Sequence, residues 1–433
     1  MITTDLLDKT GTTLVTKEFQ RLIDFASLDD GTLLIKTGKY LVSSIFLKNN
    51  MNIIFEAGAE IIATTIDDEY PIMDTRVAGI EMPWYVGVVN IINCNNVTIK
   101  GEGFINGSGP YWWSKYWGAD MLGGMRKIYD SKGMRWAADY DCMRPRNLYI
   151  CNSNNIVIND ITMKESGFWN LHVLYSNNIT INNISVLSEN KNSPSTDGID
   201  IDSSNDVLIK NCLINCNDDC ISIKSGRDYD GLRVNKPSYN ITIEDCKMLN
   251  GYGITIGSEV SGGIYNVQVN NIEFVNTDCG FRIKSSKPRK GYIRDINISN
   301  LKMKNVKYLF HIYLNWNPNY SICKMPKDYD GRILPHYDVL CHTIDSKYAN
   351  TKVDNIKIKN VISSNDDNYT GISRIFNIEG FEDSNVNNIS FENMNIISKE
   401  YGIINYASNI SFKDCTFTSS DKHDKANDVF DAR

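Results

Sequence analysis

Hydrophobic and polar residues alternate in short runs along most of the chain, a pattern typical of β-strands. One phrase recurs within these runs: Asn or Asp, an Ile or Val, one further residue, and a second apolar residue. Neighbouring copies mostly lie about 20 to 35 residues apart, which indicates an internal repeat. The copies are Asn96–Ile99, Asn155–Ile158, Asn178–Ile181, Asp206–Ile209, Asn240–Ile243, Asn266–Val269, Asp295–Ile298, Asn355–Ile358, Asn388–Phe391 and Asn409–Phe412.

This repeat predicts an all-β fold, a single-stranded right-handed parallel β-helix that forms one domain over residues 1–433. The apolar residues of the phrase are expected to point inward and to stack on their equivalents in the next coil. The leading Asn tolerates left-handed backbone geometry and is expected to bond to its neighbours along the stack. A β-sandwich also contains many short strands, but it would not repeat one phrase in this way.

A short helix is predicted near the N-terminus. Apolar residues recur at three- and four-residue steps over about residues 16–27, with Thr16 as the expected N-cap. Because a repeat stack exposes its ends, we expect this helix to cover the first coil.

Two regions rich in aromatic residues interrupt the repeat, at residues 109–146 and 313–342. They are predicted to be loop insertions near a cleft, where aromatic faces suit the binding of sugar rings. The alternative is that these side chains pack on one another over the coils.

Composition narrows the class of protein. The net charge of -7 argues against a nucleic-acid partner, and no apolar run is long enough for a membrane span or a signal peptide.

Eleven cysteines leave at least one unpaired within the chain. Cys212, Cys216 and Cys220 share a four-residue spacing, but a strand-and-turn pattern favours buried thiols over a zinc site, and we expect no metal or cofactor. These features favour the cytoplasm, or an extracellular location if the sequence is a trimmed form.

Polar side chains from four successive repeats fall on one outer face when strand alternation is applied. Ile199 and Ile201 should point inward, which turns Asp200 and Asp202 outward. The polar groups on or just before the four strands are Asp197, Asp218, Asp219, Tyr252, Arg282 and Lys284. Neighbouring strands lie about 4.8 Å apart, so carboxylates on adjacent coils fall within the length of one sugar unit. Two carboxyl groups at this scale can cleave a glycosidic bond, one as acid and one as base or nucleophile. The alternative is that these Asp residues only cap turns.

The same segments resemble glycoside hydrolase family 28, the polygalacturonases. The family's Asn-Thr-Asp, Gly/Gln-Asp-Asp, Gly-His-Gly and Arg-Ile-Lys motifs are matched, in order, by four segments. These are Ser195-Thr196-Asp197, Asn217-Asp218-Asp219, Gly251-Tyr252-Gly253 and Arg282-Ile283-Lys284.

The resemblance implies that Asp218 is the general acid and that Asp197 and Asp219 position and deprotonate the attacking water, with inversion at the anomeric carbon. It also implies that Arg282 and Lys284 bind the substrate carboxylate. We expect Lys287, Arg289 and Lys290 to extend this positive patch, which suits a uronate.

Tyr252 departs from the family pattern, because a His normally occupies this position. A Tyr stays neutral and can only donate or accept a hydrogen bond. His172 lies in a segment that resembles exo-acting members, which makes it a candidate substrate-binding residue, although a lone His more often has a structural role.

The leading prediction is an inverting hydrolase that cleaves α-galacturonosyl linkages in pectic oligosaccharides, with exo action favoured. Rhamnogalacturonan is the rival substrate. A pectate lyase would need a calcium cage of carboxylates, which the paired Asp and Arg-Xaa-Lys pattern does not match. From another class, a β-helix could be a non-catalytic carbohydrate-binding protein. The sequence does not indicate the oligomeric state.

Overall fold

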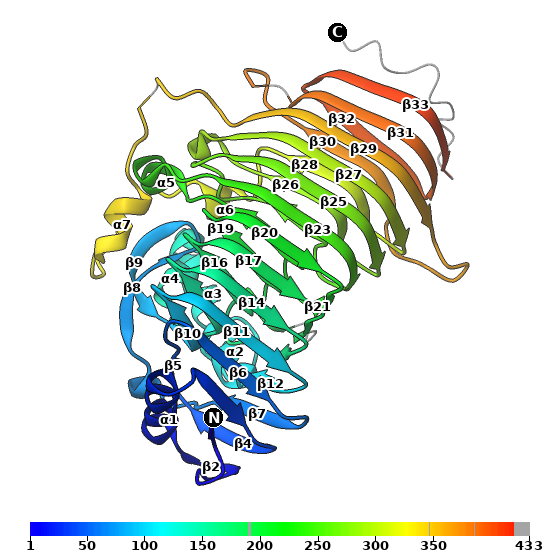
Figure 1. Cartoon of the computed structure of the whole chain (residues 1–433). Helices are drawn as coiled ribbons and strands as arrows, with labels where there is room; N and C mark the ends of the chain where they lie inside the picture. The colour runs from blue at the N-terminus through cyan, green and yellow to red at the C-terminus, as the bar shows by residue number, and fades with distance from the viewer. Residues whose placement is uncertain (189–191, 346, 385, 420–433) are drawn as a thin grey trace. The chain divides into compact units, whose positions relative to one another are not determined.

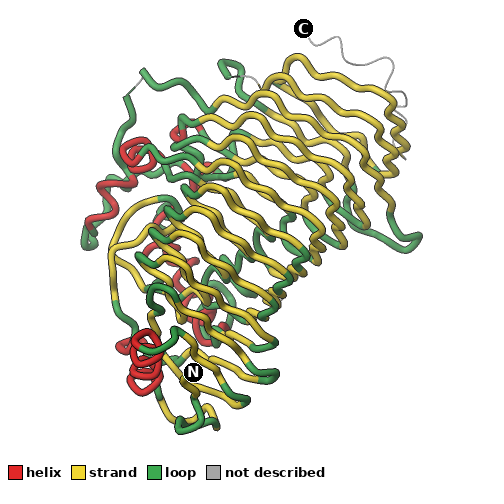
Figure 2. The backbone as a smooth tube through the Cα atoms, viewed as in Figure 1, coloured by secondary structure: helices red, strands yellow, loops and turns green. Residues whose placement is uncertain are grey.

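The computed structural model describes residues 1–188, 192–345, 347–384 and 386–419. They form two compact units: unit 1 contains residues 1–77 and 81–218, and unit 2 contains residues 78–80 and the described part of 219–433. Strands make up most of both units, and the helices are short segments (Figure 2). No helix within the described ranges has the length and apolar character needed to cross a bilayer. The single domain expected over residues 1–433 stays a prediction.

Unit 1 is built from three rows of parallel strands (Figure 1). Within each row, neighbouring strands come from successive coils. The first row contains β5 (Ile45–Phe46), β10 (Gly87–Ile92), β13 (Arg146–Cys151), β16 (Leu171–Leu174) and β19 (Ile199–Asp202). The second contains β1 (Ile2–Thr3), β3 (Thr32–Ile35), β6 (Met51–Phe55), β11 (Asn95–Gly101), β14 (Asn154–Asn159), β17 (Asn177–Asn182) and β20 (Asn205–Lys210). The third contains β2 (Thr10–Leu14), β4 (Gly38–Val42), β7 (Ala59–Ala63), β12 (Phe104–Asn106), β15 (Thr162–Lys164), β18 (Ser185–Ser188) and β21 (Leu213–Cys216).

Unit 2 has two rows of parallel strands. The first contains β22 (Ile221–Lys224), β24 (Ile254–Ile256), β26 (Cys279–Lys284), β28 (Tyr308–Tyr313), β30 (Arg374–Glu379) and β32 (Glu400–Asn405). The second contains the longer strands β23 (Ser238–Leu249), β25 (Ile264–Val275), β27 (Tyr292–Lys304), β29 (Lys352–Ser364), β31 (Val386–Ser398) and β33 (Ala407–Ser419). These stacked parallel rows confirm the predicted all-β parallel β-helix architecture.

The recurring phrase has the geometry that the sequence predicted. Its leading Asn or Asp has a positive φ, between 53° and 59°, in every copy. The side chains also bond along the stack: Asn155 Nδ2 donates to Asn96 Oδ1 at 2.7 Å in unit 1, and Asn266 donates to Asn240 at the same distance in unit 2. Left-handed turns at equivalent positions therefore keep successive coils in register.

Helix α1 (Thr16–Leu28) is the predicted capping helix, and its buried side chains are Phe19, Ile23 and Ala26. The expectation that Thr16 is the N-cap was wrong. Val15 occupies the cap position, and the Thr16 hydroxyl instead accepts a hydrogen bond from the Ser43 amide at 2.9 Å.

A two-stranded hairpin, β8 (Ile72–Val77) and β9 (Ile80–Tyr85), covers the outer face of the first row in unit 1 (Figure 1). Arg76 Nη1 donates to Asp202 Oδ1 at 2.8 Å, and both side chains are fully buried. Thr75 donates to the Tyr149 hydroxyl at 2.7 Å. Asp202 therefore points away from the coil core, as alternation predicted, and it is covered by the hairpin. Asp200 and Asp202 both have no solvent exposure.

The aromatic insertions fold into short helices. The first contains α2 (Gly109–Trp117), α3 (Gly124–Ser131), η2 (Arg135–Ala137) and α4 (Ala138–Asp141), and the second contains α6 (Pro318–Ser321) and α7 (Pro335–Leu340). Most of their large rings are buried: Trp112, Trp113, Tyr116, Trp136, Tyr140, Tyr320 and Tyr337. These rings therefore pack in the structure, and the expected place of the insertions near a cleft stays a prediction.

The three evenly spaced cysteines are buried thiols, as predicted. Each thiol donates to a backbone carbonyl close by: Cys212 to Lys210 at 3.1 Å, Cys216 to Asp218 at 3.3 Å and Cys220 to Asn250 at 3.3 Å.

We predict that Arg76→Met strongly destabilises unit 1. The substitution leaves the Asp202 carboxylate buried without its guanidinium partner, which costs about 3–5 kcal/mol. The loss is measured as a lower Tm and a lower urea midpoint at pH 7. Arg126→Met is the matched control, because Arg126 pairs with Asp130 in an exposed i,i+4 bridge worth at most about 0.5 kcal/mol. If Arg76→Met and Arg126→Met lowered stability equally, the buried Arg76–Asp202 pair would not have the stabilising role assigned to it.

The pH dependence of stability tests the same pair. Burial alone would raise the pKa of Asp202, but Arg76 and His172 outweigh it and lower the pKa from 3.8 to about 2. The ionised form therefore contributes on the order of 2 kcal/mol above pH 3.8, and this contribution disappears as the pH falls through about 2. Wild-type Tm is expected to fall as the pH is lowered from 3.8 to about 2. The fall should be smaller in Asp202→Asn, which has no carboxylate to protonate at this position.

Candidate active site

Asp197 lies in the turn that leads into β19 in unit 1, and it is buried. Its backbone carbonyl accepts two hydrogen bonds from Asn170, one from the amide at 2.9 Å and one from Nδ2 at 3.1 Å. Asn170 is fully buried and is held by Asn147, whose Nδ2 donates to Asn170 Oδ1 at 3.1 Å. Paired Asn side chains thus fix the backbone that carries Asp197.

The first aromatic insertion supports the same turn. Ser195 donates its hydroxyl to Asp139 Oδ1 at 3.2 Å, and Arg144 Nη1 donates to the Pro194 carbonyl at 2.8 Å. Burial would raise the pKa of Asp139, but Arg135 and Arg144 outweigh it and lower the pKa. Asp139 is therefore an ionised anchor for the Ser-Thr-Asp turn. Sequence reasoning missed it, because Ser195, the residue that it holds, lies 56 residues further along the chain.

Asp218 closes unit 1 in the turn after β21, and it is half-buried. The preceding Asn217 fixes this turn by donating from Nδ2 to the Ser193 carbonyl at 3.0 Å. A carboxylate oxygen of Asp218 lies within 4.8 Å of one of Asp197. The spacing fits two carboxyl groups acting on one sugar unit. It could also suit a cation, but an acidic pair alone does not indicate one, and we assign no metal.

Asp219 follows Asp218 directly in the chain and opens the first row of unit 2, where it is fully buried. Thr255 Oγ1 on β24 donates to its Oδ1 at 2.8 Å, and Lys284 Nζ on β26 donates to its Oδ2 at 2.8 Å. Arg282 also donates to Oδ1. Three side chains from two neighbouring strands thus hold this one carboxylate.

These contacts determine the protonation state of Asp219. Burial raises its pKa, but Arg282, Lys284 and Lys224 together outweigh burial and hold the pKa well below its usual range. Asp219 therefore stays ionised throughout the pH range of ordinary assays. Such a carboxylate can orient water and accept a hydrogen bond from it, but it cannot be a proton donor.

The Gly-Tyr-Gly segment is a tight turn before β24. Gly251 and Gly253 have φ values of 65° and 62°, and a Cβ on Gly253 would lie 2.2 Å from the Cys279 carbonyl oxygen. Tyr252 sits between them with its ring 4.4 Å from the Arg282 guanidinium carbon. The glycines permit the turn, and the turn brings an aromatic face to the cation that holds Asp219.

One of the basic residues after β26, Arg289, does not extend the positive patch that the sequence predicted. Lys284 contacts Asp219 and lies 4.5 Å from the Trp316 ring centre. Arg289 is fully buried and pairs with Asp228, so it does not extend a surface patch. Lys287 is exposed. The roles of Arg282 and Lys284 toward a substrate carboxylate stay predictions.

His172 on β16 belongs to the buried cluster beneath the hairpin. Its Nε2 lies 3.6 Å from Asp202 Oδ2, and its ring stacks on Tyr149 at 5.4 Å and meets the edge of Trp169 at 4.8 Å. The side chain has no solvent exposure. The structure therefore favours the structural alternative for His172, because a substrate could reach this ring only if the hairpin moved.

Comparisons with known proteins agree with the motif order. The model of glycosyl hydrolases family 28 matches residues 82–328. A probable polygalacturonase of Vitis vinifera is 28% identical over 318 residues, which cover 71% of this chain and 61% of the relative. A probable endo-xylogalacturonan hydrolase A of Aspergillus fumigatus is 25% identical over 266 residues, which cover 55% and 62%. The crystal structure of a hyperthermoactive exopolygalacturonase from Thermotoga maritima superposes with a TM-score of 0.76 at 25% identity, covering 95% of this chain and 89% of that chain. The chain thus spans about three fifths of the length of these two curated relatives.

Proposed function

Because the chain belongs to glycosyl hydrolases family 28, we propose that it hydrolyses α-galacturonosyl linkages in pectic oligosaccharides and that it acts from the chain end. The observation that carries hydrolysis is the pair of carboxylates at Asp197 and Asp218, whose oxygens lie within 4.8 Å of each other. Asp219 adds a third carboxylate with a fixed negative charge.

The surroundings of the three carboxylates indicate the role of each. Asp218 is half-buried and is the general acid that protonates the leaving oxygen. Asp219 cannot take this part because its pKa is held low by Arg282 and Lys284. Asp197 and Asp219 instead orient and deprotonate the attacking water.

We propose inversion at the anomeric carbon. Inversion is what the family resemblance implies for an acid at Asp218 with Asp197 and Asp219 acting on the attacking water. The configuration of the first product decides between inversion and retention.

Exo action is supported by the hairpin in unit 1. An endo-acting enzyme needs an open groove along which a polymer continues in both directions. The outer face of β13, β16 and β19 is instead filled by the hairpin, with Arg76 on Asp202 and Arg146 donating to the Tyr85 carbonyl at 3.1 Å. The similarity to an exopolygalacturonase structure points the same way.

Rhamnogalacturonan is the second candidate substrate, and Tyr252 is the residue that favours it. The ring occupies the position of the usual motif His and contacts Arg282. A neutral phenol cannot supply the charge that a His can. A changed residue at this position is a reason to test the second substrate.

We predict that Asp218→Asn lowers kcat by about 10²- to 10⁴-fold, because the amide cannot donate the acid's proton. Reducing-sugar release from trigalacturonate measures the loss. Asp206→Asn is the control, since Asp206 lies at a left-handed turn of the repeat. Undiminished release by Asp218→Asn would exclude Asp218 as the acid. No release by wild type from any pectic substrate would favour the non-catalytic binding protein.

Free galacturonate is expected as the only early product from a galacturonate hexamer, and it should appear first as the β-anomer. Chromatography of the products and ¹H NMR of the anomeric protons measure the two properties. Early dimers and trimers would contradict exo action, whereas an initial α-anomer would contradict inversion without affecting exo action.

Substitutions of Tyr252 separate its ring from its hydroxyl. Tyr252→Phe keeps the aromatic face beneath Arg282 and should retain most of kcat/KM, whereas Tyr252→Ala should lose roughly 2- to 30-fold. Assays on galacturonan and rhamnogalacturonan oligomers in parallel give the preferred substrate. If Tyr252→Phe falls as far as Tyr252→Ala, the hydroxyl and not the ring carries the function.

A further inference from the structure

A cavity of about 310 Å³ opens in unit 2 among the segments that follow the first-row strands. Its walls come from η3 (Lys287–Arg289), the start of α5 (Asp228–Val234) and the chain between α6 and residue 344. Asp219 and its ligands lie on β24, β26 and the turn before β22, so the cavity has a different set of residues from the candidate active site. Its volume is at the lower end of the range for small-ligand sites.

The charge of the cavity is positive. Lys287, Lys290 and Lys324 contribute to its lining. The lining also includes Asp228, but buried guanidinium groups compensate that carboxylate: Arg289 bonds to Oδ1, and Arg227 Nε lies 3.3 Å from Oδ2. The cavity is thus basic on a chain whose net charge is -7. A local cationic concavity of this kind attracts small anions.

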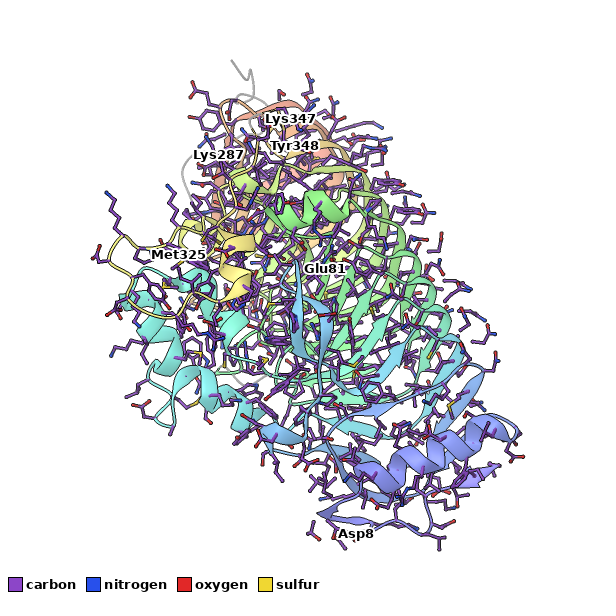
Figure 3. The ribbon with its side chains drawn as sticks, turned by 90° about the vertical axis from the view of Figure 1, so that its left-hand side faces the viewer. Asp8, Glu81, Lys287, Met325, Lys347 and Tyr348 are labelled. Carbon is purple, nitrogen blue, oxygen red and sulfur yellow. The ribbon has the colours of Figure 1, made fainter. Side chains whose placement is uncertain are left out.

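Two of the lysines are held at the rim by contacts outside the cavity. Lys290 Nζ donates to Asn350 Oδ1 at 3.2 Å, and Lys287 Nζ lies 5.1 Å from the centre of the Phe381 ring. Lys287 can be located in Figure 3. Lys287 and Lys324 are both exposed, so their ammonium groups can turn toward an anion in the cavity.

Apolar and aromatic groups next to the lysines suit a sugar ring. Ile322 and Ile344 line the cavity together with His342. The His342 ring lies against Tyr229, with ring centres 3.7 Å apart, and these two rings line a neighbouring cavity of about 330 Å³. Apolar side chains beside cations match a uronate, which has an apolar ring face and a carboxylate.

We propose that this lysine-lined cavity is an accessory binding site for the galacturonate end of an oligosaccharide, separate from the site of hydrolysis. The ligand class rests on the proposed function, since it is the substrate of that function that supplies the uronate. The site holds the acid sugar by its carboxylate, through Lys287 and Lys324, and by its ring, through the apolar wall.

The test uses the full chain carrying Asp218→Asn, so that the ligand is not consumed. Trigalacturonate is titrated by calorimetry, and we expect a binding event that weakens at least about tenfold when Lys287→Gln and Lys324→Gln are added. Both lysines are exposed, so their replacement does not threaten folding. The matched control adds Lys357→Gln and Lys359→Gln, which remove the same charge from exposed positions on β29 and should leave every event unchanged.

Two further ligands test which chemical group of the oligosaccharide the lysine-lined cavity binds. Galactotriose, which lacks the carboxylate, should not produce the lysine-dependent event, and inorganic phosphate should compete for it only weakly. Competition by phosphate as strong as that by trigalacturonate would overturn the assignment to a uronate.

The outcomes separate this proposal from the proposed function. If the lysine substitutions change no binding event, the accessory site is excluded, even when wild type hydrolyses trigalacturonate. If wild type releases no product but the lysine-dependent event persists, the hydrolase proposal fails and the accessory site stands.

Discussion

The parallel register between coils is the constraint on which the rest of this structure depends. It is kept by left-handed turns at Asn or Asp, whose side chains bond from one coil to the next, as Asn155 bonds to Asn96 at 2.7 Å. Because each coil repeats the same turn, a residue in one strand lies beside its equivalent in the next. Thr255 pairs with Arg282 in register, and this places both on the same carboxylate, Asp219. The shared register therefore brings together side chains from motifs that are far apart in the sequence.

The outward positions of the first-row strands serve two different purposes. In unit 1 they carry Asp202, which is buried under the hairpin and paired with Arg76. In unit 2 they carry Arg282 and Lys284, which converge on Asp219. Both carboxylates are buried, and both have a lowered pKa because adjacent cations outweigh the cost of burial. Their low pKa values alone do not distinguish a structural anchor from a catalytic group, and the role of Asp219 rests on the family motif that it shares with Asp218.

The candidate catalytic residues are supported by contacts from distant parts of the chain. Asp139 in the first insertion holds Ser195, and Asn170 on the preceding coil holds the carbonyl of Asp197. Neither contact touches a carboxylate of the candidate pair. Their effect is to fix the backbone, so that the carboxylate pair has a defined separation before any substrate binds.

The sequence by itself determined the repeat, the strand alternation, the left-handed turns and the candidate carboxylates, because these depend on spacing within a few residues. It also located Tyr252 as the departure from the family motif. Only the tertiary structure decided which outward side chains are covered. His172, Asp200 and Arg289 carry no local signal of burial, since each is buried by a segment distant in the chain or by a distant ion partner. The aromatic insertions were undecided for the same reason. Whether a ring faces solvent or another ring depends on how a loop folds back, and hydrophobic periodicity does not encode that.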